Sequence, residues 1–198
     1  MKSIIKKINL LLLLGVIAMT NNHGYAGDFN YTRYESRDPE LNISIDYLEG
    51  WICKEQRGPE NKFVNILFFE NRKDKDYKAF ISVTVENLSA IAIKPLTIEA
   101  LADDLITKRA KFKDAKLLSK AKKEILGLEV QDITMSYQAL DKLHSLDAKV
   151  ILVKEGMIIF IRDNKFYTIQ YQNRESEFDR FSQAFSHIIE TMRFQDGK

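Results

Sequence analysis

The sequence predicts an α+β domain in which helices pack on an antiparallel sheet. Several short segments alternate apolar and polar residues with the two-residue period of half-buried strands. These segments follow one another directly, a helical segment divides them into two groups, and a second helical segment ends the chain. The composition agrees with a globular domain, because 45% of the 198 residues are hydrophobic and 29% are charged.

The first 26 residues have the organisation of an export signal. A lysine-containing start precedes an apolar run from Leu10 to Met19, and Gly24 and Ala26 place small residues where a signal peptidase cleaves. The run is too short for a spanning helix, which needs about 20 apolar residues, so a cleaved signal peptide is favoured over a retained anchor. We therefore expect cleavage near Ala26 and a periplasmic or secreted mature protein.

The mature chain is nearly neutral. Three of the 30 basic residues and none of the 28 acidic residues belong to the signal, which leaves 27 bases against 28 acids. This balance argues against nucleic-acid binding, which needs a strongly basic surface. The single cysteine, Cys53, cannot form a disulfide within the chain. We expect it to be a small, partly buried apolar residue, with a reactive or intermolecular thiol as the alternative.

The mature chain divides into a short leader and one domain. Residues 27–40 are polar, charged and aperiodic, and they are expected to be a flexible leader. Residues 41–194 are expected to form a single domain. Its first strand covers residues 41–47, where apolar residues alternate with polar ones. A turn at Gly50 follows, after which Trp51 is expected to pack back across the sheet.

A hairpin and a helix are expected next. Residues 65–69 form a short apolar run, residues 81–85 alternate regularly, and a charged segment between them is suited to a turn. Thr97 has the side chain of a helix N-cap, and Glu99 favours the positive end of the helix dipole. The helix is expected to end at about Ala110.

A mixed segment and a clear strand follow this helix. Residues 111–123 alternate poorly, and they contain one weak strand at residues 115–118. Gly127 marks a turn. In the following strand, apolar residues from Ile133 to Ala139 recur at every second position and face one way.

The last third of the chain predicts strands and a helix. Residues 148–153 and 157–161 are two strands, or one long strand with a bulge at Gly156. The second of them is apolar throughout, as expected of a central strand covered on both faces. A turn separates it from a strand at residues 166–171. Residues 178–192 carry an apolar stripe with helical spacing.

No catalytic or cofactor-binding motif occurs in the sequence. The signatures of nucleophile elbows, phosphate-binding loops and zinc proteases are absent, so we predict no catalytic residues and no cofactor. His187 and Glu190 are three residues apart on the last helix and could share a metal. Because zinc sites generally need three or four protein ligands, this pair is half a site and we predict no metal.

The most unusual feature is a basic segment. Eight bases and one acid occur between Lys108 and Lys123. Such a segment suits docking on an acidic protein face or on anionic lipid headgroups. The alternative is a solvated helix end and strand surface whose lysines keep a sheet edge soluble. Only one aromatic residue, Phe112, is interleaved, whereas a site for single-stranded nucleic acid needs several aromatic side chains on which bases stack. The candidate docking residues are Lys111, Lys113, Lys116, Lys120, Lys122 and Lys123.

Several short motifs occur in the order and spacing of one known family. They are Tyr47-x-x-Gly50-Trp51, Ile81-x-Val83-x-Val85-Glu86, Leu126-Gly127, Phe166-Tyr167-Thr168-Ile169-Gln170-Tyr171, and Phe178 through Phe185 to Ile188-Ile189-x-x-Met192-Arg193-Phe194. In these motifs residues 41–194 resemble the PsbP-like proteins and bacterial relatives such as DcrB. The family commonly has a proline before the Gly-Trp turn, where this chain has Leu48-Glu49. The metal-binding histidines of photosynthetic PsbP have no match here, so no functional residue is transferred.

The resemblance implies an α/β/α sandwich around an antiparallel sheet and a role without catalysis. We therefore expect an exported, non-catalytic accessory or binding protein of the cell envelope. Its expected partner is an envelope or membrane-associated protein, with an anionic lipid surface as a further option. The alternative is a small-molecule or metal-binding module, or a hydrolase, with a cleft near Trp51. Fold alone does not decide between them.

Overall fold

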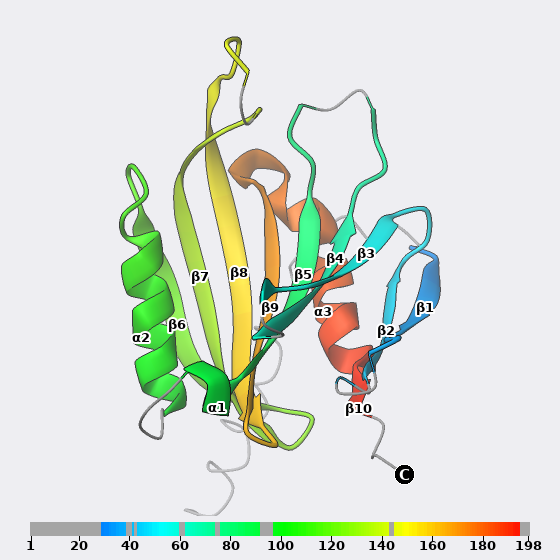
Figure 1. Cartoon of the computed structure of the whole chain (residues 1–198). Coiled ribbons are helices and arrows are strands. Elements are labelled where there is room, and N and C mark those ends of the chain that lie inside the picture. Colours follow the sequence, from blue (N-terminus) through cyan, green and yellow to red (C-terminus); the bar gives the residue numbers. More distant parts are fainter. Residues whose placement is uncertain are drawn as a thin grey trace, which may run out of the picture.

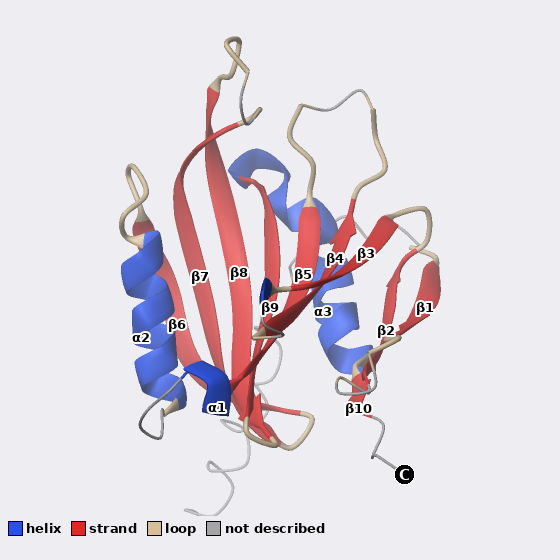
Figure 2. Cartoon of the chain, in the orientation of Figure 1, coloured by secondary structure: helices blue, strands red, loops and turns tan. Residues whose placement is uncertain are grey.

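Two antiparallel sheets and three helices make up the described part of the chain (Figures 1 and 2). The computed structural model describes residues 29–38, 41, 43–59, 62–73, 76–91, 97–142 and 145–194. The predicted signal peptide, residues 1–26, lies outside the described residues. No helix among the described residues is long and apolar enough to cross a membrane.

The larger sheet has seven strands in the order β3-β4-β5-β9-β8-β7-β6. They are β3 (Ile52–Arg57), β4 (Phe63–Phe69), β5 (Phe80–Asn87), β6 (Lys116–Ile125), β7 (Leu128–Leu140), β8 (Val150–Arg162) and β9 (Lys165–Arg174). The smaller sheet has the order β1-β2-β10 and contains β1 (Tyr31–Glu35), β2 (Ile43–Leu48) and β10 (Arg193–Phe194). The helices are α1 (Leu88–Ile91), α2 (Ile98–Arg109) and α3 (Ser182–Thr191), and the 3₁₀ segment η2 (Glu175–Phe181) precedes α3.

The two long helices cover opposite faces of the larger sheet. Neighbouring side chains of a strand point to opposite faces. Glu155 of β8 pairs with Arg109 of α2, whereas the next residue, Gly156, lies under Phe185 of α3. The smaller sheet lies in the same layer as α3. Tyr47 of β2 stacks on Phe68 of β4, which points to the same face of the larger sheet as Gly156. The structure is mostly antiparallel β-sheet with two long helices, as the predicted α+β class implies, and it differs from the expected single sheet by having a second one (Figure 2).

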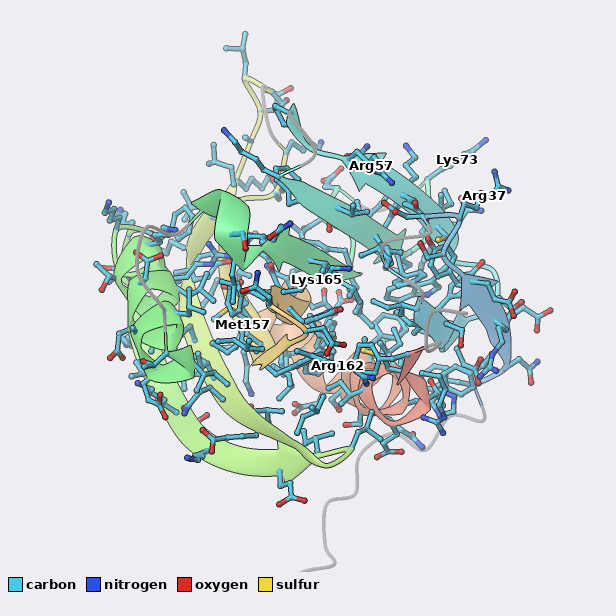
Figure 3. All side chains as sticks on the ribbon, turned by 60° about the horizontal axis from the view of Figure 1, so that its bottom comes forward. Arg37, Arg57, Lys73, Met157, Arg162 and Lys165 are labelled. Atoms are coloured by element: carbon cyan, nitrogen blue, oxygen red, sulfur yellow. The ribbon has the colours of Figure 1, made fainter. Side chains whose placement is uncertain are left out.

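The main core lies between the larger sheet and the layer that contains α3. Ile66, Ile81 and Val83 are fully buried and belong to β4 and β5, which pair in the predicted antiparallel hairpin. Met157, on the other face, lies between α2 and the strands (Figure 3). The central position predicted for residues 157–161 is correct, because β8 lies between β7 and β9.

The sequence predicted the positions of α2 and β8 in the chain correctly. The helix begins at Ile98, and Thr97 caps it by accepting a 3.2 Å hydrogen bond from the amide of Ala100. The expected strands at 148–153 and 157–161 are one strand, β8, as in the alternative considered. The bulge expected at Gly156 was wrong, because pairing with both neighbours continues through this residue.

Residues 27–40, expected to be a flexible leader, contain strand β1. This strand pairs along its whole length with β2. Tyr31 stacks on His187 of α3 with 3.7 Å between ring centres, and Tyr34 meets Phe68 edge-on at 5.8 Å. The two tyrosines are three residues apart, with Thr32 and Arg33 between them, so the sequence lacks the two-residue period of a strand, and the ordered fold begins before Leu41.

Two further segments differ from expectation. The mixed segment 111–123, expected to hold a weak strand at 115–118, contributes most of the ten-residue strand β6. The last helix is α-helical only from Ser182, because side chains of β9 bind the carbonyl groups before it. Tyr171 donates a 2.6 Å hydrogen bond to the carbonyl of Phe178, and Asn173 donates one of 2.9 Å to that of Glu177.

Candidate functional site: the basic edge strand and the adjoining groove

Strand β6 carries most of the predicted docking residues and lies at an edge of the larger sheet. Nine of its ten residues are exposed, which is far more than in any central strand of this sheet. It contains four lysines and one glutamate. Lysines on an edge strand hinder uncontrolled pairing with other chains, and they also attract acidic partners.

Three of the predicted lysines form ion pairs that divide them between the two faces of β6. Lys120 contacts Asp103 of α2 at 2.6 Å, and Lys122 contacts Glu129 of β7 at 2.6 Å, both on the face of α2. On the face of α3, Lys123 contacts Asp132 at 2.5 Å. Such exposed pairs are weak, about 0–1 kcal/mol each, so a partner with acidic groups can replace them.

The other three predicted lysines have no carboxylate partner among the described residues. Lys111 and Lys113 lie in the exposed turn between α2 and β6, and Lys116 begins the strand. The backbone of this turn is fixed, because the amide of Gln138 in β7 donates a 2.8 Å hydrogen bond to the carbonyl of Lys113. The unpaired positive charge of the segment is therefore concentrated at one end of β6.

A groove runs between α3 and the strands β6, β7 and β8, and it has a free volume of about 350 Å³. The strands contribute Lys123, Ile125, Asp132, Thr134, Gly156 and Ile158, and the helical side contributes Phe178, Ser182, Phe185, Ser186, Ile189 and Glu190. The floor is mainly apolar, whereas the Lys123–Asp132 pair and Glu190 carry charge. This volume lies at the lower end of the range of small-molecule pockets, about 300–1,000 Å³.

Gly156 explains how the rings of the groove approach the sheet. A Cβ atom at this position would lie 3.4 Å from the rings of both Phe178 and Phe185. The absence of a side chain thus lets the two rings lie directly on β8. Sequence reasoning associated this glycine with a bulge, and its function in packing depends on residues more than twenty positions later in the chain.

Trp51 and Cys53 lie outside the groove beside α3. Trp51 packs edge-on against Phe181 with 5.1 Å between ring centres, and neither residue lines that groove. Cys53 is half-buried. Burial, and then the charge of Glu55, raise the pKa of the Cys53 thiol to about 11, so the thiol is protonated at neutral pH.

An ion pair under α2 was not predicted. Glu155 is completely buried in β8, and the guanidinium Nε of Arg109 donates to its two oxygens at 3.0 and 2.9 Å. Burial and the charge of Glu155 raise the pKa of the nearby Tyr137 hydroxyl, which accepts a 2.9 Å hydrogen bond from Gln172. The only signal in the sequence was a glutamate within a largely apolar segment, and its partner is 46 positions away in the chain. The pair is well satisfied and stabilises the position of α2.

His187, which with Glu190 was considered as half of a metal site, has another contact in the fold. The imidazole of His187 stacks on Tyr31 and belongs to the contact between β1 and α3. Among the described residues no group of three or more histidine, cysteine, aspartate or glutamate side chains could hold a metal ion.

Known structures share this arrangement of strands and helices. No protein-family model and no curated protein sequence matches the chain. The solution structure of cyanobacterial PsbP from Synechocystis sp. PCC 6803 aligns with a TM-score of 0.53 and 13% identity, over 87% of this chain and 96% of that chain.

Two further structures have similar scores. LpqN of Mycobacterium tuberculosis, described as involved in cell envelope biogenesis, aligns with a TM-score of 0.54 and 10% identity, over 86% of this chain and 93% of that chain. The Ran-binding protein Mog1p of Saccharomyces cerevisiae aligns with a TM-score of 0.54 and 11% identity, over 85% of this chain and 97% of that chain. At such identities the likeness concerns the fold. As the sequence motifs implied, the chain has the PsbP-like fold.

Proposed function

We propose that this protein is an exported, non-catalytic accessory protein of the cell envelope that binds a protein partner through β6. The docking surface consists of β6 and the turn before it, with the six lysines from Lys111 to Lys123 named above. The observation that carries the proposal is the exposure of this long, basic edge strand. An envelope location rests on the export signal in residues 1–26.

The chemistry of β6 favours an acidic partner of a different sequence. The outer edge of a terminal strand presents backbone N–H and C=O groups that a neighbouring strand can bind. Two copies paired through β6 would bring their lysines together, and like charges on opposing strands are destabilising. A partner segment with acidic side chains would instead exchange ion pairs with Lys120 and Lys123 and neutralise Lys116.

The structural neighbours agree with a binding role without assigning a partner. LpqN is described as an envelope biogenesis protein and Mog1p as a Ran-binding protein. Both show that this fold serves cellular roles of different kinds, and a fold by itself does not fix a function.

The test is a crosslinking pull-down from intact cells with the tagged mature protein. The variant reverses three charges on β6, K116E, K120E and K123E. The control reverses Lys54, Lys62 and Lys73, which are exposed near the opposite edge of the sheet. We expect one specific envelope protein to be captured by the normal form and the control, and lost from the variant. Equal capture by all three forms, with each form folded by circular dichroism, would refute the proposal.

The groove beside α3 supports a second candidate function, binding of a small molecule with an apolar part. Its apolar floor and polar rim have the general character of ligand sites. The test is thermal stability against a panel of metabolites and metal ions. A ligand at 100 times its dissociation constant stabilises a protein by about 2.7 kcal/mol, so a panel without any shift would count against this candidate.

A further inference from the structure

The β7–β8 hairpin carries an unusual group of exposed apolar side chains. Leu140 and Val150 face each other across the two strands and are 46% and 60% exposed. Leu152 lies on the same face, two residues further along β8, and is 42% exposed. Leu146, in the connection between the strands, is fully exposed. Single exposed leucines are common, but a contiguous apolar group generally marks an interaction site.

The position of the hairpin explains why these side chains remain uncovered. Its strands extend past both long helices and project at the top of Figure 1. Nearer the sheet centre the same two strands bury their apolar residues, such as Ile133 and Met157. The turn between α2 and β6 lies beside the base of the projection, where Phe112 stacks on Tyr137 and remains 47% exposed.

Basic residues surround this apolar group. Lys149 is exposed and directly precedes Val150, and Lys154 lies two residues beyond Leu152 on the same face. Lys111 and Lys113 of the neighbouring turn are exposed and have no carboxylate partner among the described residues.

The nearby acids offset this positive charge only in part. Asp114 is an exposed carboxylate beside Lys113 and accepts a hydrogen bond from Gln138, whereas Asp141 is buried beside Arg174. Asp76 is paired with Lys142 at 3.0 Å. Among the described residues only Asp147 is an exposed acid of the hairpin connection itself.

We propose that this hairpin end docks on the surface of an anionic lipid bilayer. In this arrangement Leu146, Leu140 and Val150 enter the interfacial region, while Lys113 and Lys149 contact lipid phosphates. Apolar residues that insert shallowly, combined with lysines that bind anionic headgroups, are the two components of peripheral membrane binding. The projecting shape suits a lipid surface, since it enters a bilayer without needing a matching hollow. A second copy of the chain would bring the same lysines together.

This membrane contact overlaps the partner surface proposed on β6 only at the turn that holds Lys111 and Lys113. Lys120 and Lys123 lie further along β6 from Lys113, opposite Ile133 and Val130 of β7, whereas the hairpin begins beyond Leu140. The three substitutions on β6, K116E, K120E and K123E, leave the hairpin unchanged, and L146D with V150D leaves β6 unchanged, so each interaction can be lost without the other.

The test is co-sedimentation of residues 27–198 with lipid vesicles. This form contains every described strand and helix and lacks the apolar run of the signal, which would itself bind lipid. One vesicle preparation is pure phosphatidylcholine, and the other contains 30% phosphatidylglycerol. The variants are L146D combined with V150D, and K113E combined with K149E. The control is L126D, a half-exposed residue at the opposite end of β7.

We expect binding to the anionic vesicles that falls at least tenfold with pure phosphatidylcholine and at least tenfold in either double variant. Binding should also fall with added salt, because screening weakens the lysine–phosphate contacts. The L126D form should bind as the unchanged protein does. The proposal is overturned by absence of binding to anionic vesicles, or by equal binding of the double variants. A crosslink from this hairpin to a protein, with no vesicle binding, would assign the patch to a protein partner instead.

Discussion

Two ion pairs in the last turn of α2 differ in the environment of their charges. Lys108 contacts Asp104 at 2.7 Å, and both side chains are more than half exposed to solvent. Arg109, the next residue, contacts the fully buried Glu155. Water solvates the first pair whether or not it forms, whereas the buried carboxylate depends on its partner. Sequence spacing reveals the first pair, and only the fold reveals the second.

Replacing Arg109 should destabilise the protein strongly. R109M leaves the Glu155 carboxylate buried without its cation, and loss of one partner of a buried pair typically costs about 3–5 kcal/mol. K108M, the matched control, should change stability by less than about 0.5 kcal/mol. Urea unfolding followed by tryptophan fluorescence measures both free energies. Similar values for the two variants would mean that Glu155 is solvated or protonated in the folded protein.

Cys53 should be an unreactive thiol. Burial and the charge of Glu55 raise its pKa to about 11, above the usual 9.0, so little thiolate exists at pH 8. The folded protein should react with a maleimide at least tenfold more slowly than the unfolded chain. Its rate should still rise between pH 9 and pH 10, because the thiol is not yet fully ionised there. A rate that levels off below pH 9 would contradict this account.

At the scale of elements, the sequence pattern predicted correctly those elements that bury at least one face. The hairpin of β4 and β5, helix α2 with its Thr97 cap, and the central part of β8 all bury a regular set of apolar residues. Strand β6 carries charged residues on both faces, and the five-residue strand β1 carries Arg33 and Glu35 on one face. The order of both strands comes from pairing with β2 and β7. The periodicity of apolar residues therefore could not predict these two strands.

The groove beside α3 was also beyond sequence reasoning, because its walls come from distant segments. Of the residues that line the groove, Lys123 was predicted as a docking residue. Gly156 was interpreted as a possible bulge, and its position under two aromatic rings was not predicted. The spacing of apolar residues along a strand does not show which later segment of the chain will pack on that strand.

Substitutions at Gly156 should show how closely this wall packs. G156A places a Cβ in ordinary contact, 3.4 Å from the two rings, and should leave stability within about 1 kcal/mol. G156V adds two methyl groups that the rings must move to admit, at a cost of about 1–3 kcal/mol. Thermal unfolding of both variants measures these effects. If G156V were as stable as the unchanged protein, the rings would not lie on β8 as described.

At the scale of the whole molecule, the protein has the PsbP-like fold, and we propose that this fold carries two surfaces for binding. The PsbP-like fold was predicted from several short motifs. Each motif alone is weak evidence, but their order along the chain was informative. The small sheet of β1, β2 and β10 did not follow, because its two end strands are short or highly charged. The partner is not encoded in any local motif.

Export predicts a specific mature form. Protein made in its native cell from the complete reading frame should be recovered with Gly27 as its first residue, because Ala26 ends the cleavage site. Intact mass and N-terminal sequencing of the protein released from the envelope fraction measure this. Recovery of the chain with Met1 and the apolar run still attached would show a retained anchor and contradict the prediction.

The proposal that β6 is a protein-docking surface can be tested by site-specific photocrosslinking in living cells. A photoreactive amino acid replaces Leu118 in the bulge of β6 or, as the control, Phe63 in β4, two positions of similar exposure near opposite edges of the sheet. The account predicts a crosslink from position 118 to one envelope protein and none from position 63. A crosslink from position 63 alone, or from neither position, would contradict the assignment of β6 as the docking surface.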